Sequence, residues 1–167
     1  LRDAHLKLKS SKCHILQKRV LFLGHIVSAD GISTDPEKVE SIRSWPVPKT
    51  VREVRSFVGL CSYYRRYVQG FAHIAGPLHG LTKKNCRFNW NEECQQAFET
   101  LKEKLISSPI LAFPQDEGRY ILDTDASDIG IGAVLSQEQD GHERVIVYAS
   151  RLCTVAERNY HVMRREL

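Results

Sequence analysis

The sequence lacks the features of secreted and membrane proteins. None of the apolar stretches in its 167 residues approaches the roughly 20 residues that a membrane-spanning helix needs, and the segment from Leu1 to His5 has no signal-peptide pattern. The five cysteines lie at wide, irregular spacings without a Cys-X-X-Cys pair, which argues against a disulfide framework and a zinc site. We therefore expect an intracellular protein with reduced thiols and no membrane partner. Because the chain does not begin with methionine, we also expect it to be part of a longer protein.

Most familiar catalytic motifs are missing as well. The chain has no Gly-rich phosphate loop ending in Lys-Ser/Thr, no His-Glu-X-X-His motif and no nucleophile elbow. The seven histidines show no metal-ligand spacing, and there are no internal repeats or low-complexity tracts. These absences exclude P-loop nucleotide chemistry, zincin-type proteolysis and repeat architectures.

The charge is divided unevenly along the chain. Residues 1–112 hold 18 Lys/Arg and 10 Asp/Glu, a net charge of +8, whereas residues 113–167 hold 6 and 10, a net charge of −4. A basic unit suits a polyanion such as nucleic acid, and an acidic unit suits carboxylates that bind divalent metal. The alternative is ordinary scatter of charge over solvated surfaces. The split favours two units with a boundary near 112–118.

Local patterns predict helices in the first unit and strands in the second. The β-branched and aromatic residues from Val20 to Val27 predict a strand followed by a turn at 29–31. Capping signals and apolar spacing predict helices over 36–44, from 51 to a break near Gly59, and from 90 to about 106, whereas residues 76–77 and 83–85 are typical of loops. Strands are expected over 119–124, 131–137 and 144–149, with a turn at 139–142 and a final helix capped by Thr154 and Glu157. The fold class is therefore α+β.

Aromatic and basic side chains are interspersed in the sequence Tyr63-Tyr64-Arg65-Arg66-Tyr67. Such a mixture suits nucleic acid, because guanidinium groups pair with phosphates and phenol rings stack on bases or sugars. The alternative is a helix whose tyrosines face the core and whose arginines face water.

Acidic residues gather where a strand is predicted to end, in Thr124-Asp125-Ala126-Ser127. Hydrolysis of a phosphodiester by two divalent metals needs several carboxylates on rigid elements that hold the ions roughly 3.5 to 4 Å apart. Asp125 and Glu166, on the following helix, are candidates to supply two, and Asp123 shares the strand face of Asp125. The alternative is that these are ordinary surface carboxylates.

Six ordered blocks resemble the Pol polyprotein of gypsy-type long-terminal-repeat retrotransposons over essentially the whole chain. They are Phe22 to Ser28, Gly31 to Val39, Trp45-Pro46-Val47-Pro48, Arg55 to Leu60, Tyr63 to Tyr67, and Thr124 to Ser127. The resemblance implies the end of a reverse transcriptase palm with its primer-grip hairpin (1–33), a mainly helical thumb (34–112), and the N-terminal β-β-β-α part of a ribonuclease H-like domain (118–167).

The resemblance also implies roles for individual residues. Phe22, Leu23, Gly24 and His25 would form the primer grip, which positions the primer 3′ end. The backbone of the primer-template duplex or RNA/DNA hybrid would contact Arg52, Arg55, Tyr63, Arg65 and Arg66, in a manner that is salt-sensitive and indifferent to sequence.

Asp125 and Glu166 match the family's first catalytic aspartate and its catalytic glutamate, which bind Mg²⁺, with Mn²⁺ as a possible substitute. Arg164 departs from the family, which often has an acidic residue there. The Tyr-X-Asp-Asp motif and other palm aspartate, and the two later ribonuclease H aspartates, are not in this chain.

We therefore expect a segment of an RNA-directed DNA polymerase and ribonuclease H that neither polymerises nor cleaves by itself. One alternative is a domesticated or decayed remnant that binds nucleic acid without chemistry. Another is an unrelated interaction protein, for which duplex binding would be absent.

Overall fold

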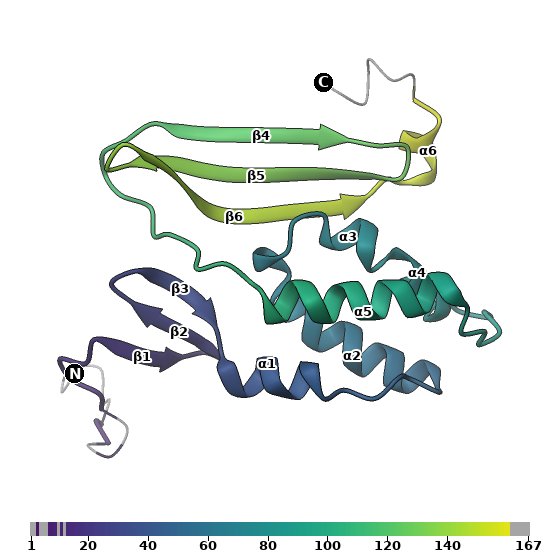
Figure 1. Ribbon diagram of the computed structural model, residues 1–167, viewed down its shortest axis with the longest axis horizontal. Coiled ribbons are helices and arrows are strands. Elements are labelled where there is room, and N and C mark those ends of the chain that lie inside the picture. The colour runs from purple at the N-terminus through teal and green to yellow at the C-terminus, as the bar shows by residue number, and fades with distance from the viewer. Residues whose placement is uncertain (1–2, 4–6, 10, 12, 161–167) are drawn as a thin grey trace.

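The computed structural model describes residues 3, 7–9, 11 and 13–160. A small three-stranded sheet is followed by a helical unit and by a second, longer three-stranded sheet (Figure 1). Figure 1 shows the second sheet lying along one side of the helical unit, with β6 (His142–Leu152) next to α3 (Phe71–Ile74). Across the described residues, none of the helices combines the length and apolar character needed to cross a membrane.

The first sheet consists of two consecutive hairpins. Strands β1 (Arg19–Phe22), β2 (His25–Ser28) and β3 (Gly31–Thr34) pair antiparallel in sequence order. The prediction of one strand over 20–27 was wrong, because Leu23 and Gly24 form a two-residue turn between β1 and β2. Both turn residues have positive φ, +46° and +68°, as a type I′ hairpin turn requires. The second turn, at residues 29–30, lies where it was predicted.

Helices α1 (Pro36–Arg43) and α2 (Val51–Tyr63) begin where they were predicted to begin. The Asp35 side chain accepts a hydrogen bond from the Glu37 amide, and Thr50 accepts one from the Glu53 amide. The predicted break near Gly59 was wrong, since α2 continues to Tyr63. Its buried face extends to both sides of the exposed Gly59, and this packing offsets the roughly 1 kcal/mol that a helical glycine costs.

A short 3₁₀ turn, η2 (Arg65–Tyr67), and helices α3 and α4 (Gly76–Leu81) lead into α5 (Glu92–Ile106). Residues 76–77 had been predicted as loop, and this was wrong. Pro77 is compatible with the first turn of α4, and burial of Leu78 and Leu81 stabilises the helix. The third predicted helix is confirmed, with Asn91 as its N-cap.

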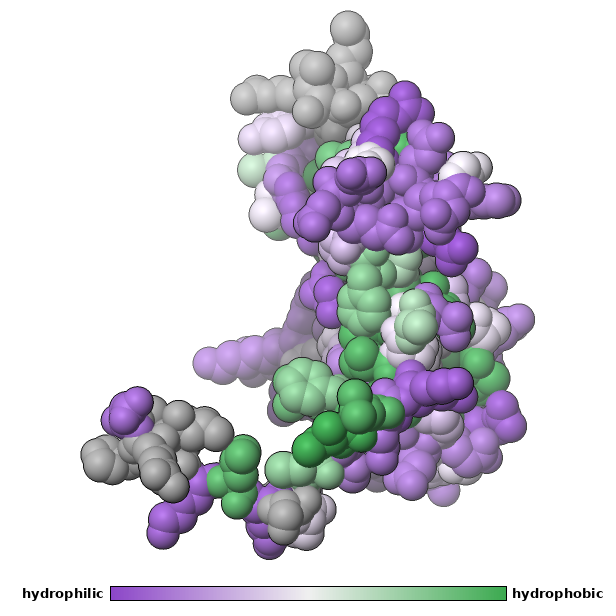
Figure 2. Space-filling model, turned by 90° about the vertical axis from the view of Figure 1, so that its left-hand side faces the viewer, coloured by the Kyte–Doolittle hydropathy of each residue, from purple (hydrophilic) through white to green (hydrophobic). Residues whose placement is uncertain are grey.

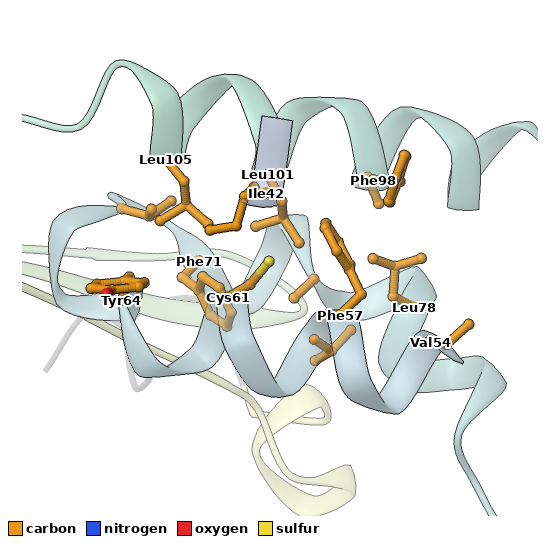
Figure 3. Close-up of a cluster of buried hydrophobic side chains, with 14 of the residues drawn as sticks. Ile42, Val54, Phe57, Cys61, Tyr64, Phe71, Leu78, Phe98, Leu101 and Leu105 are labelled. Carbon is orange, nitrogen blue, oxygen red and sulfur yellow. The ribbon is translucent and has the colours of Figure 1, made fainter. Parts of the chain in front are cut away.

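The main hydrophobic core lies between α2, α4 and α5. Figure 3 shows Phe57 of α2 and Leu78 of α4 beneath Phe98 and Leu101 of α5, and the ring centroids of Phe57 and Phe98 are 4.6 Å apart. Each of these four side chains is fully buried. Cys61 contributes to the same core, and all five cysteines are free, as expected.

The second sheet confirms the predicted change to strands. Strands β4 (Tyr120–Ala126), β5 (Gly130–Gln139) and β6 pair antiparallel in sequence order, and β5 and β6 join at the predicted turn through Asp140 and Gly141. Thr154 and Glu157 form the predicted capping box at the start of α6 (Val155–Arg158).

The segment between the helical unit and the second sheet is bound on both sides. Leu111 exchanges two backbone hydrogen bonds with Ile32 of β3, at 2.8 and 2.9 Å. The fully buried amide of Gln137 accepts from the Gln115 amide at 2.9 Å and donates to the carbonyls of Gln115 and Glu117 at 2.9 and 3.0 Å. The segment is therefore held in place rather than being a free linker.

Candidate nucleic-acid interface

The β1–β2 turn presents two large apolar side chains to solvent. Phe22 is 61% exposed and Leu23 is 71% exposed, although neighbouring residues of β2 are half-buried. Figure 2 shows the end of the molecule that carries this sheet, where hydrophobic side chains gather below a mainly hydrophilic upper part. The exposed side chains of Phe22 and Leu23 are therefore available for contact with a large ligand.

Three tyrosines lie beneath the turn and hydrogen bond to it. The Tyr63 hydroxyl donates to the Leu23 carbonyl, and the Tyr64 hydroxyl donates to the Gly24 carbonyl at 2.7 Å. The Tyr67 hydroxyl lies 3.0 Å from His25 Nδ1. The His25 ring stacks on Tyr63, with centroids 5.3 Å apart and an interplanar angle of 12°.

Burial of the phenols affects the protonation of this cluster. It raises the pKa of Tyr64 to about 12, with a smaller contribution from the Asp35 charge, and it raises the pKa of Tyr67 to about 12. Partial burial, followed by the charge of Arg66, lowers the pKa of His25. At neutral pH Tyr64 and Tyr67 therefore keep their hydroxyl protons and the His25 ring is neutral; the His25 tautomer decides which of His25 and Tyr67 donates in their hydrogen bond.

Gly24 is required by the turn and by the tyrosines. Its φ of +68° lies in the left-handed region, and a Cβ atom there would meet Tyr63 Cε1 at 3.3 Å and the Tyr64 hydroxyl at 3.5 Å. The close neighbours of this glycine are thus tyrosine side chains of the same chain.

The predicted arginines have different surroundings. Arg55 donates to the Thr82 carbonyl at 3.1 Å, and Arg65 donates to the Ser150 carbonyl of β6 while lying over the Phe71 ring at 5.9 Å. The side chains of Arg52 and Arg66 are exposed and make no hydrogen bond or ion pair with any residue in the described part of the chain. Arg52 and Arg66 are therefore the predicted arginines that are free to bind phosphate.

Asp125 lies in β4 opposite Gly132 of β5, which in turn pairs with Ser150 of β6. Its exposed side chain lines a cleft of about 320 Å³ between the second sheet and the segment around α3. The other lining residues are Gln69, Gly70, His73, Ile74, Ser127, Gly130, Ile131, Gly132, Ser150 and Arg151. Ser127 closes the following turn, accepting from the Gly130 amide at 3.1 Å. The prediction of a carboxylate near a strand end is confirmed.

The described residues supply one carboxylate to this cleft. Among residues 3, 7–9, 11 and 13–160, no group of three or more His, Cys, Asp or Glu side chains is arranged to hold a metal ion. Glu166, the second predicted ligand, and Arg164 lie outside the described residues. A Mg²⁺ ion needs several oxygen ligands, so the described part of the chain does not form a complete metal site.

Sequence reasoning did not identify Tyr64 and Tyr67 as partners of the turn. Their spacing of three residues indicated only a shared helix face, and the turn that they contact lies about 40 residues earlier in the chain. The turn and the Asp125 cleft have no residue in common. Both contact the segment 63–74, which therefore connects the two regions.

A family model and several solved structures match this chain. A family model described as the RNase H-like domain found in reverse transcriptase matches residues 90–167, a range that includes α5 as well as β4–β6. The fold is similar to that of the foamy viral protease-reverse transcriptase in complex with RNA/DNA hybrid, with a TM-score of 0.77 and 24% identity over 93% of this chain and 21% of that chain. The complex of the same enzyme with dsDNA gives a TM-score of 0.76, 24% identity, and coverage of 89% and 31%.

Curated relatives match the whole chain. The retrovirus-related Pol polyprotein from transposon 297 of Drosophila melanogaster is 44% identical and that from transposon opus is 41% identical, each over 100% of this chain. The transposon Tf2-3 polyprotein of Schizosaccharomyces pombe is 34% identical over the same range. The chain spans only 16%, 18% and 13% of these three proteins, respectively. Over its whole length, the chain is therefore a homologue of one segment of the Pol polyproteins of gypsy-type long-terminal-repeat retrotransposons.

Proposed function

We propose that this chain is the segment of a Pol polyprotein that joins the end of a reverse transcriptase palm (1–33) to a thumb (34–112) and to the start of a ribonuclease H domain (118–167). The match of the entire chain to such polyproteins, at up to 44% identity, carries the proposal. The principal partners are a primer-template duplex, an RNA/DNA hybrid and the remainder of the Pol polyprotein.

Binding of the duplex uses the β1–β2 turn and the free arginines. The solved relatives are complexes with RNA/DNA hybrid and with dsDNA, which supports a nucleic-acid duplex as the ligand. Phe22 and Leu23 would contact the primer end, while Arg52 and Arg66 would pair with phosphates. Guanidinium–phosphate pairs release condensed counterions, so the affinity would fall steeply with salt and depend little on sequence.

In the full-length protein the second sheet would serve a nuclease. Asp125 would supply one carboxylate, and Glu166 a second, to a site for Mg²⁺ or Mn²⁺ that degrades the RNA strand of a hybrid. Divalent metals at such sites activate water and stabilise the leaving oxygen. The role of Asp125 itself is to hold a negative oxygen at the open edge of the cleft, where the residue opposite it, Gly132, has no side chain to fill the space.

The test is binding of the purified chain to a fluorescent RNA/DNA hybrid between about 50 and 200 mM salt. The logarithm of the affinity should fall linearly with the logarithm of the salt concentration, and Arg52→Ala should reduce the slope by about 1. Arg144→Ala, which removes an exposed arginine from β6, is the matched control and should leave the slope unchanged. Absence of binding by the folded chain at low salt would refute the proposal.

A further inference from the structure

The conformation of the β1–β2 turn is not one that its own sequence favours. Leu23 has φ of +46°, although type I′ turns prefer Asn, Asp or Gly at this position. A left-handed conformation is unfavourable for residues other than Gly, Asn and Asp, because it brings Cβ close to the following carbonyl oxygen. Because Leu23 is 71% exposed, burial of its side chain does not offset this cost. Other groups must therefore hold the turn.

Those groups are the hydroxyls of Tyr63, Tyr64 and Tyr67. They come from the end of α2 and from η2. They reach the two turn residues, at the Leu23 and Gly24 carbonyls, and the ring of His25, the first residue of β2. The rings of Tyr64 and Tyr67 are buried in the core of the helical unit, at 0% and 2% exposure. The base of the turn is thus bonded to rigid, packed elements.

The hydroxyls of Tyr64 and Tyr67 have a role separate from that of their rings. A phenylalanine at position 64 or 67 would fill the same core volume, because only the hydroxyl oxygen is lost. The Gly24 carbonyl and His25 Nδ1 would then lose these partners, while the packing of the rings would remain. The hydroxyls consequently act on the turn, about 40 residues away, more than on the core.

We propose that Tyr63, Tyr64 and Tyr67 are positioning residues, whose hydroxyls hold the β1–β2 turn in the conformation that presents Phe22 and Leu23 to the primer end of a bound duplex. This assignment rests on the proposed function. It gives the segment Tyr63–Tyr67 two separate tasks: its tyrosines orient the turn, and Arg66 remains available for phosphate.

The experiment compares two RNA/DNA hybrids with the same number of base pairs. One has a recessed primer 3′ end, and the other is a dumbbell whose ends are closed by loops and which therefore has no primer terminus. Tyr64→Phe/Tyr67→Phe should weaken binding to the recessed hybrid by about 3- to 10-fold, the range expected for lost hydrogen bonds, and leave binding to the dumbbell within about twofold. Tyr120→Phe, at an exposed tyrosine of β4, is the control and should change neither affinity.

A second variant tests the same assignment in case the double variant does not fold. Tyr63 is 50% exposed, so Tyr63→Phe does not disturb the core. Like the double variant, it should weaken binding to the recessed hybrid more than binding to the dumbbell. An equal loss on both hybrids, or no loss on either, would overturn the assignment of the tyrosines while leaving duplex binding intact. A wild-type chain that binds neither hybrid would overturn the proposed function and this assignment with it.

Discussion

Replacing Arg65 and Arg66 by alanine, one at a time, should produce two different defects, although these residues are neighbours in the sequence. Arg65 donates a hydrogen bond to the Ser150 carbonyl of β6, and its guanidinium lies 5.9 Å from the centre of the Phe71 ring. Ser150 also accepts a hydrogen bond from the Ala72 amide through its hydroxyl, at 2.9 Å. Arg65 is therefore part of the contact between the helical unit and the second sheet.

The cost of Arg65→Ala follows from these two contacts. A hydrogen bond at an exposed site contributes about 0.5 to 1 kcal/mol, and an exposed cation–π contact contributes about the same. The free energy of unfolding should therefore fall by about 1 to 2 kcal/mol. For a chain of this size, that corresponds to a Tm lower by about 2 to 8 °C. Because Arg65 already has partners within the chain, the salt dependence of duplex binding should not change.

Arg66→Ala should have the opposite profile. Its side chain is exposed and has no hydrogen-bonded or ion-paired partner among the residues that the structure describes. Its loss should leave the Tm unchanged within about 1 °C, since exposed side chains without partners contribute little to stability. The slope of log affinity against log salt should fall by about 0.9, the value for one phosphate contact on a duplex.

Thermal unfolding followed by circular dichroism, together with fluorescence anisotropy across a salt series, measures both quantities on the same preparations. A lower salt slope for Arg65→Ala with an unchanged Tm would show that Arg65 binds phosphate and does not join the two units. A stability loss in Arg66→Ala equal to that in Arg65→Ala would equally refute the distinction drawn between them.

Two further predictions concern the turn and the connecting segment. Burial lowers the pKa of His25 below its ordinary value of 6.5, so the unfolded state binds a proton at His25 more tightly than the folded state does. The contribution of neutral His25 to stability is therefore complete above pH 6.5 and is lost as the pH falls through the pKa of the folded state. Between about pH 7.5 and 5.5, the free energy of unfolding measured with urea should therefore fall less in His25→Gln than in the wild type. An identical fall in both proteins would contradict this account. Gln137→Ala should lower the free energy of unfolding by about 1 to 3 kcal/mol, because the backbone amide and carbonyl of Gln115 lose the fully buried side chain that is their hydrogen-bond partner. Glu138→Ala, at the exposed neighbour, should cost less than about 0.5 kcal/mol, and a similar cost for both variants would count against the role of Gln137.

Elements with a local signal could be predicted from the sequence. Capping interactions reach three residues or fewer along the chain, so the starts of α2 and α6 were visible at Thr50 and Thr154. The alternation of the second sheet and the turn at Asp140 and Gly141 were visible for the same reason. The position of Asp125 near the end of a strand followed from these local patterns.

Elements that depend on distant packing were predicted incorrectly. Gly59 is a poor helix former, but α2 passes through it because the buried residues before and after it continue one apolar face. The short helix α4 forms around the buried Leu78 and Leu81, whose partners lie on other helices. The turn at Leu23 and Gly24 has a leucine where an asparagine would be expected, so the short-range signal for a hairpin was absent.

The sequence by itself determined the family to which the chain is related, the α+β class and the residues with the chemistry to bind nucleic acid or metal, because these depend on residue type and short-range order. The tertiary structure alone decided which of those residues are free to act. Arg65 is bound to β6 through a contact that spans 85 residues, whereas Arg66 next to it is free of bonds to the described residues. Tyr64 and Tyr67 face a turn that precedes them by 40 and 42 residues. Such assignments depend on contacts between segments far apart in the chain, for which local sequence patterns hold no signal.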